Sequence, residues 1–294
     1  MNCEIMLMEN NVDIVYFSGT GGTERAAKCF KTSFEKVGRE VTLSKVKDAP
    51  ISFGEEDGLI LLLYPVLAAN APRLVHDWIE RLESVKGKRA AVISVSGGGE
   101  MSPNTACRAA VIRKLERKGF VVTYEEMLVM PANFIKFSGV PLSRLLLEAL
   151  PKKVEAAVSR LESGFVTRSR PLPVDRLISA AAKLEQLGAV SFGKSIAVTD
   201  ACISCGRCAE NCPSGNITML EGNPIFGSSC NLCMGCIYGC PTGALKPQMM
   251  KSAVLKEGFN LEAIEKAELP QNADINALTR GYSWKGVRKY LTGD

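Results

Sequence analysis

The sequence predicts an α/β domain built on a doubly wound, parallel, five-stranded sheet, followed by a small α+β domain that is rich in cysteine. Three observations lead to this fold class. Short aliphatic runs alternate with longer helical patterns through residues 12–165, the third run is apolar on both faces, and eight of the 11 cysteines fall within residues 202–240. Alternation of strand and helix patterns is typical of a parallel sheet that helices cover on both sides.

The strands follow from β-branched and aliphatic runs, and the helices from the patterns between them. We expect strands at Val12–Phe17, Val41–Val46, Leu59–Tyr64, Ala90–Val95 and Val121–Val129. We expect helices at residues 23–37, 72–84, 104–118 and 143–162. Because the third strand is apolar on both faces, it belongs in the centre of the sheet, and the strand order 2-1-3-4-5 fits this connectivity.

Shifts in composition divide the chain into four parts. Residues 1–166 form the α/β domain, and the polar, proline-bearing residues 167–195 form a connector. Residues 196–248 hold the cysteine repeat. Residues 249–294 form a tail with helix-like pieces at Leu261–Lys266 and Ser283–Leu291, and the sequence does not indicate its role.

Charge and hydropathy exclude several classes of protein. The 36 basic and 31 acidic residues are interspersed, without the basic stripe of a nucleic-acid-binding protein. No apolar stretch reaches the ~18 residues of a membrane span, and the N-terminus lacks the pattern of a secretory signal. We therefore expect a cytoplasmic protein whose thiols stay reduced, and the oligomeric state is left open.

The clustered cysteines form two copies of one pattern, C-x2-C-x2-C-x3-C-P. The copies comprise Cys202, Cys205, Cys208 and Cys212-Pro213, then Cys230, Cys233, Cys236 and Cys240-Pro241. A tight loop of this spacing presents three thiolates to an iron–sulfur cubane, whereas the fourth serves the other cluster. One [4Fe–4S] cluster is therefore expected on Cys202, Cys205, Cys208 and Cys240, and a second on Cys230, Cys233, Cys236 and Cys212.

The alternative to two clusters is a pair of zinc sites, because C-x2-C pairs also bind tetrahedral zinc. Zinc needs four ligands per site and gives no reason for a third cysteine at the same spacing followed by C-P, so clusters are favoured. Over about 50 residues the repeat resembles the two-cluster bacterial ferredoxin. The resemblance implies a pseudo-twofold α+β module in which each cluster transfers one electron.

A glycine-rich loop follows the first strand and opens the first helix. Its residues are Ser18, Gly19, Thr20, Gly21, Gly22 and Thr23. The unpaired N–H groups and positive dipole end of a helix N-terminus favour a phosphate there, and the hydroxyls of the loop add donors. The alternatives are a plain glycine-rich turn or a dinucleotide loop, but the dinucleotide pattern fails because Glu24 stands where its third glycine is required.

This loop resembles the FMN-phosphate loop of flavodoxins, S/T-x-T-G-x-T, which implies a flavodoxin-like sheet with a flavin at the carboxyl ends of the third and fourth strands. The ring-binding residues implied there are Tyr64, Pro65 and Val66 after the third strand and Ser96, Gly97, Gly98 and Gly99 after the fourth. The fourth-strand loop lacks a side chain large enough to stack on the ring. Tyr64, or Asn133 and Phe134 after the fifth strand, are the candidates to cover it.

The whole chain resembles flavodoxin–ferredoxin fusion proteins of anaerobic prokaryotes, with residues 12–165 and 196–248 carrying the resemblance. It implies an electron carrier in which FMN and the clusters exchange low-potential electrons with a redox partner protein. The alternative is a flavin-dependent reductase of a small molecule such as a quinone. No catalytic residue is predicted, and the carrier is favoured because the flavin loop shows no clear proton donor.

Three further patterns are set aside. Residues 188–195 match the nucleotide P-loop G-x-x-x-x-G-K-[ST], but they follow a helical stretch, whereas a P-loop follows a strand. The sole histidine, His76, is expected to have a surface or packing role. Cys3, Cys29 and Cys107 lack mutual spacing, and we assign them no role.

Overall fold

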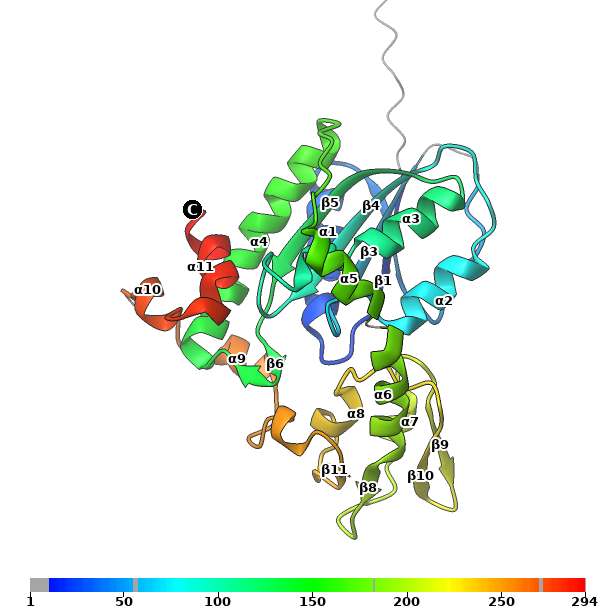
Figure 1. Cartoon of the computed structure of the whole chain (residues 1–294), viewed down its shortest axis with the longest axis vertical. Coiled ribbons are helices and arrows are strands. Elements are labelled where there is room, and N and C mark those ends of the chain that lie inside the picture. The colour runs from blue at the N-terminus through cyan, green and yellow to red at the C-terminus, as the bar shows by residue number, and fades with distance from the viewer. Residues whose placement is uncertain (1–10, 55–57, 182, 270–271, 294) are drawn as a thin grey trace, which may run out of the picture.

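The structure is a computed structural model that describes residues 11–54, 58–181, 183–269 and 272–293 (Figure 1). Its centre is a five-stranded sheet in which every neighbouring pair is parallel, in the order β2-β1-β3-β4-β5. The strands are β1 (Asn11–Tyr16), β2 (Glu40–Lys45), β3 (Gly58–Pro65), β4 (Arg89–Ser96) and β5 (Val121–Val129). This order and the flanking helices are those of the flavodoxin-like fold, as the sequence predicts.

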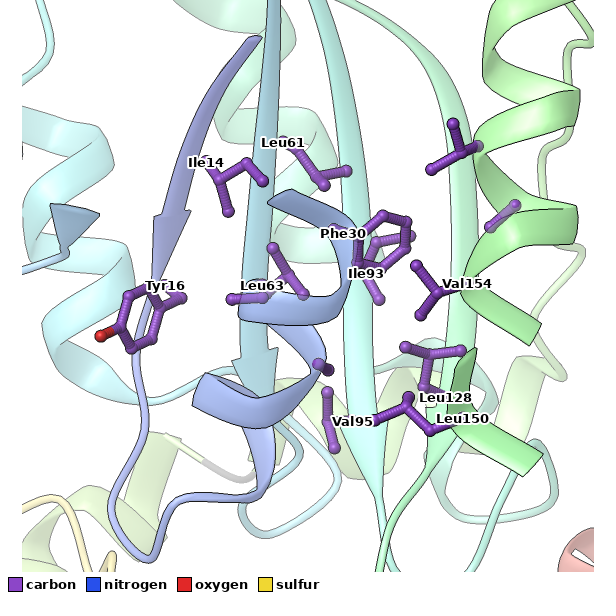
Figure 2. Packing of buried hydrophobic residues seen from close by; sticks show 14 of the residues in the cluster. Ile14, Tyr16, Phe30, Leu61, Leu63, Ile93, Val95, Leu128, Leu150 and Val154 are labelled. Atoms are coloured by element: carbon purple, nitrogen blue, oxygen red, sulfur yellow. The ribbon is translucent and has the colours of Figure 1, made fainter. Parts of the chain in front are cut away.

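Helices cover both faces of the sheet. They are α1 (Gly22–Lys36), α2 (Arg73–Arg81), α3 (Ala109–Arg117) and α4 (Val140–Glu162). Helices α1 and α4 pack on one face, where Leu61 and Ile93 of the sheet meet Phe30 and Val154 of the helices (Figure 2). Helices α2 and α3 pack on the other face.

The central strand β3 separates two hydrophobic cores. Its side chains alternate between them, with Leu61 and Leu63 on the α1–α4 side and Leu62 and Tyr64 on the α2–α3 side. All four are 0% exposed. Each buried aliphatic side chain contributes about 1.5–3 kcal/mol relative to exposure, so burial on both faces explains why the run has no polar position.

The third predicted helix differs from the expectation. The segment begins with a short 3-10 turn, η1 (Asn104–Ala106), and α3 starts only at Ala109. Arg108 lies between them and is 2% exposed, because its guanidinium bonds to Glu100 and Glu125. A buried ion pair at this position holds the chain in a turn that a helical periodicity does not indicate.

The cysteine-rich part lies at the edge of the sheet where the parallel strands end (Figure 1). It contains two antiparallel two-stranded sheets, β8 with β11 and β9 with β10, and two short helices, each of which contains the third cysteine of its repeat. The connector forms α5 (Pro173–Ala181) and α6 (Lys183–Lys194). The cysteine-rich part forms β8 (Ile196–Val198), α7 (Arg207–Glu210), β9 (Ile217–Leu220), β10 (Asn223–Phe226), α8 (Gly235–Tyr238) and β11 (Leu245–Pro247). Phe192 of α6 shares a core with Ile196, Met234 and Leu245.

The tail returns to the sheet domain. Its elements are η2 (Lys251–Ala253), α9 (Leu261–Lys266), α10 (Ile275–Leu278), η3 (Tyr282–Trp284) and α11 (Lys285–Thr292). Leu261 and Ile264 of α9 join the α1–α4 core, and Trp284 and Val287 pack on β5 and α4. Two short strands, β6 (Asn133–Phe134) and β7 (Lys136–Phe137), follow β5, and Phe134 pairs with Val254 of the tail.

Among the described residues, no helix combines the length and apolar character that a membrane crossing requires.

Candidate functional site

The loop between β1 and α1 has the features of a phosphate site. Gly21 caps α1 with a φ of 92°, and no side chain caps this helix end, so N–H groups of its first turn remain available. The Ser18 hydroxyl oxygen is buried and has no hydrogen-bond partner among the described atoms. A buried polar atom without a partner costs about 1–3 kcal/mol. A bound phosphate would satisfy it, so these residues fit the phosphate of FMN.

A cavity of about 350 Å³ lies beside this loop and at the ends of β3, β4 and β5. It brings together most of the residues that the sequence predicts for the flavin. Those on its wall are Ser18, Gly19, Thr20, Gly22, Thr23, Pro65, Val66, Ser96, Gly97, Gly98, Asn133 and Phe134. The Asn133 side-chain amide donates a hydrogen bond to the Thr20 hydroxyl, which ties the β5 loop to the phosphate loop.

Three predicted residues are not on this wall. Tyr64 is fully buried in the α2–α3 core, where its hydroxyl donates to the Cys107 carbonyl at 3.4 Å. Its place follows from the alternation of β3, which turns Tyr64 to the face opposite Leu63. Gly21 caps α1 behind the wall, and Gly99 contacts the tail.

Among the other residues that line the cavity, four come from outside the sheet domain. Leu232 and Cys233 come from the second cysteine group, and Ser283 and Trp284 come from the tail. Trp284 and Phe134 are the aromatic side chains among the lining residues. A tryptophan in the tail was the available signal, but only the fold places it near residues far away in sequence.

The β4 loop is held by a buried charge network. The Arg108 guanidinium bonds to Glu125 at 2.7 Å, to Glu100 at 2.9 Å and to the Ser94 hydroxyl at 2.8 Å. The two carboxylates raise the pKa of Arg108 further above its ordinary value, although burial opposes this. Because the network spans both ends of residues 94–100, it positions the backbone of Gly97 and Gly98 at the cavity.

The eight clustered cysteines form two groups in space, and each group draws one member from the other repeat. One small cavity is lined by Cys202, Cys205, Cys208 and Cys240. A second is lined by Cys212, Cys230, Cys233 and Cys236. This is the crossed grouping that the spacing predicts. Within the described residues, no three His, Cys, Asp or Glu side chains meet the geometry for a single metal ion.

The two cysteine groups share their backbone conformation. We call residues 230–236 the inner loop and residues 202–208 the outer loop. Leu232 and Met234 of the inner loop have φ of 56° and 62°, and Ser204 and Gly206 at the same repeat positions have 54° and 72°. Each loop is thus curved in the same way toward its own cavity.

The fourth cysteine of each repeat is also held alike. The Cys212 sulfur accepts a hydrogen bond from the Asn216 N–H, and the Cys240 sulfur accepts one from the Ala244 N–H, both at 3.3 Å. Such N–H···S bonds stabilise thiolates that ligate a cluster and tune its potential.

Burial acts differently on the cysteine thiols. It raises the pKa of Cys233 to about 12, so this thiol stays protonated at neutral pH unless a bound metal favours the thiolate. At Cys240 burial also acts to raise the pKa, but hydrogen bonds from Thr242 and nearby backbone N–H groups outweigh it and lower the pKa below its ordinary value.

The inner loop touches the phosphate loop directly. A Cβ atom built on Gly19 would lie 2.4 Å from the Cys233 carbonyl oxygen and 3.0 Å from its sulfur. A Cβ atom built on Gly235 would lie 2.6 Å from the Gly19 carbonyl oxygen. Only glycine permits so close an approach of two backbones, and Cys233 therefore belongs both to the cavity and to a cysteine group.

The patterns set aside have structural roles. Residues 188–194 form the second half of α6, and Ser195 lies between this helix and β8, so the segment lacks the strand–loop–helix order of a P-loop. His76 is 8% exposed and lies 3.4 Å from the Asn70 side-chain oxygen. Cys29 and Cys107 lie in the sheet domain away from the cysteine groups, and Cys3 lies outside the described residues.

Comparison with known proteins supports the ferredoxin part. The family described as "4Fe-4S binding domain" matches residues 197–218, which include the first four clustered cysteines. A ferredoxin-type protein of methylamine utilization, MauM of Methylobacillus flagellatus, is 32% identical over 120 residues. That match covers 36% of this chain and 47% of the relative, so the chain spans about half of the relative's length.

Solved structures similar to the chain include flavodoxins. Oxidised flavodoxin 2 of Bacillus cereus is 20% identical, with a TM-score of 0.36, and the match covers 51% of this chain and 99% of that one. General stress protein 14 of Treponema denticola, solved with FMN, is 8% identical, with a TM-score of 0.38 and coverage of 53% and 99%. The strand order observed here, rather than these scores, establishes the flavodoxin-like fold.

The chain thus joins a flavodoxin-like α/β domain to a ferredoxin-type 4Fe-4S segment.

Proposed function

We propose that this chain is an electron-transfer iron–sulfur flavoprotein that couples one FMN to two [4Fe–4S] clusters and exchanges electrons with a redox partner protein. Bound FMN would supply one- and two-electron redox chemistry, and each cluster would supply one-electron chemistry. The observation that carries the proposal is the contact between Gly19 of the phosphate loop and Cys233 of the inner loop.

This contact sets the spatial order of the flavin cavity and the two cysteine groups. Cys233 lies on the wall of the flavin cavity, whereas the outer-loop cysteines are absent from that wall and line a cavity of their own. The outer loop reaches the surface, because Cys205 is exposed and the neighbouring Ile203 is 63% exposed. The inner-loop cysteines therefore stand between the flavin cavity and the outer loop, and the outer loop offers the surface for a partner.

The lining of the flavin cavity favours a carrier over a reductase. Apart from Cys233, the residues on its wall carry no side chain that titrates, since the polar ones are Ser, Thr and Asn. A reductase of a quinone-like molecule needs a proton donor beside the flavin. The residues described here would hold and shield a flavin without supplying that donor.

Anaerobic reduction of the purified protein tests the proposal. We expect an uptake of about four electrons per chain from a strong reductant, two for FMN and one for each cluster. A low-potential donor such as reduced ferredoxin should replace the reductant, and NADH or NADPH alone should reduce the protein slowly or not at all. Rapid, saturable bleaching by either nucleotide would instead support the reductase.

A variant of the phosphate loop provides the matched control. Gly21→Asp places a negative charge, on a residue with a φ of 92°, beside the expected phosphate. It should lose FMN but keep its iron, so that the uptake falls to about two electrons. If the purified variant kept one FMN per chain, the phosphate loop would not be part of the FMN-binding site.

A further inference from the structure

The tail contacts the flavin cavity through a close backbone approach. A Cβ atom on Gly99 would lie 2.7 Å from the Gly286 carbonyl carbon, and one on Gly286 would lie 2.4 Å from the Gly98 carbonyl oxygen. Gly98 lines the cavity, and Gly286 follows η3 in the first turn of α11. The two segments therefore fit together only because each side is glycine at the point of contact.

The tail segment is fixed in this position by its own packing. Val287 is 0% exposed and shares a small core with Val129 of β5 and Leu142 and Leu146 of α4. The Arg288 guanidinium donates to the Thr279 hydroxyl at 3.1 Å, which ties α11 to the end of α10. Residues 279–288 thus form an ordered unit against the sheet domain.

Trp284 stands where this unit meets the cavity. It is 8% exposed, it joins the core formed by Val129 and Leu146, and it also lines the cavity beside Gly97 and Gly98. Neither Tyr64 nor the β4 loop offers the cavity an aromatic side chain, and Phe134 of the β5 loop is the other aromatic residue on the wall. A flat ring in this cavity would meet these two aromatic side chains, of which the indole is the larger.

We infer that Trp284 of the tail is an FMN-binding residue and that residues 282–287 complete the flavin site. The inference rests on the proposed FMN site. Aromatic rings gain from offset or edge-to-face contact beyond the area that they bury. The loss of this contact should weaken FMN binding by about 2- to 10-fold.

The chain offers a matched control, since it holds only two tryptophans. Trp78 of α2 is 0% exposed in the α2–α3 core, where its indole N–H donates to the Pro50 carbonyl at 3.1 Å. The experiment uses full-length protein with its clusters in place, from which FMN is removed and then titrated back. Trp284→Phe, Trp284→Ala and Trp78→Phe are compared with the unchanged chain.

We expect Trp284→Ala to bind FMN more weakly than Trp284→Phe, and Trp78→Phe to bind it like the unchanged chain. Tryptophan emission gives a second readout, which a purely structural role would not move. The emission of Trp78→Phe, which comes from Trp284, should fall steeply when FMN binds, and that of Trp284→Phe should fall less.

Two outcomes overturn the inference and separate it from the proposed function. If FMN binds to all four proteins with equal affinity, or quenches Trp78 as strongly as Trp284, the tail is not part of the flavin site. If the unchanged chain does not bind FMN, the proposed function fails as well.

Discussion

The inner and outer loops have the same cysteine spacing and the same backbone curvature, but their surroundings differ at each matched position. Gly235 of the inner loop touches Gly19, whereas Arg207 at the same position of the outer loop is exposed. Asn231 is 8% exposed and accepts a hydrogen bond from the Leu74 N–H, whereas Ile203 is 63% exposed. The repeat presents the same cysteine spacing twice, and the residues between the cysteines decide which copy lines the proposed flavin cavity.

The largest expected effect separates the two cysteine groups. Cys240→Ser should remove the outer cluster and Cys212→Ser the inner one, each with a loss of about half of the iron, because the fourth ligand comes from the other repeat. Iron analysis and electron paramagnetic resonance of the reduced variants measure this. Cys208→Ser should lose the same signal as Cys240→Ser.

Loss of the inner-loop signal in Cys240→Ser would show that the ligands are not crossed. The two variants should also differ in FMN content. Cys212→Ser should bind FMN more weakly, because the inner loop forms part of the cavity wall, and Cys240→Ser should not.

Alanine substitutions at matched positions of the two loops test the contact between the inner loop and the phosphate loop. Gly235→Ala should destabilise the protein by about 1–3 kcal/mol, because its Cβ would lie 2.6 Å from the Gly19 carbonyl oxygen. Arg207→Ala, at the same place in the outer loop, should change little. Urea denaturation followed by circular dichroism measures the stability of both variants. Equal losses of stability would contradict the conclusion that only the inner loop packs against the phosphate loop.

The position after the first cysteine of each loop gives the next comparison. Asn231→Ala removes the acceptor of the Leu74 N–H, and an unsatisfied buried donor costs about 1–3 kcal/mol. Because Leu74 is only partly buried, we expect the lower part of this range. Ile203→Ala on the exposed outer loop should stay within about 0.5 kcal/mol. The same denaturation experiment measures the stability of both variants. A larger loss of stability for Ile203→Ala than for Asn231→Ala would show that the outer loop, and not the inner loop, packs against the sheet domain.

The last comparison concerns Tyr238 of α8, the helix that begins at the end of the inner loop. Its hydroxyl donates to the Asn133 carbonyl at 2.8 Å and accepts from the Leu255 N–H at 2.9 Å. Tyr238→Phe should lower stability by about 0.5–1.5 kcal/mol per hydrogen bond lost. Tyr282→Phe is the control, because Tyr282 is 72% exposed. Equal stability of the two variants would mean that the bond from Tyr238 to the Asn133 carbonyl does not hold the inner loop to the sheet domain.

The sequence predicted those features that local patterns determine. Strand order followed from apolar runs such as Leu59–Tyr64, and the crossed cysteine groups followed from spacing alone. The predicted phosphate loop is also the loop that leaves the Ser18 hydroxyl without a partner.

The features that the sequence did not indicate depend on contacts between distant segments. Nothing near Trp284 or Leu232 in sequence shows that they meet at the same cavity. Alternation along β3 turns Tyr64 to the face opposite Leu63, and only the fold shows that α2 and α3 cover this face and leave the side chain outside the cavity. Gly235 and Gly286 appeared as ordinary glycines until the structure showed the backbones that each one contacts.

The contact between Gly286 and the β4 loop has a consequence for how the protein is made. During translation, the phosphate loop and the sheet emerge long before residues 283–286, and the cysteine repeat emerges between them. The flavin cavity therefore gains its last wall after the cluster ligands are available. We expect cells limited for iron to yield protein that is poor in both iron and FMN, and cells limited for riboflavin to yield protein that lacks FMN but keeps its iron.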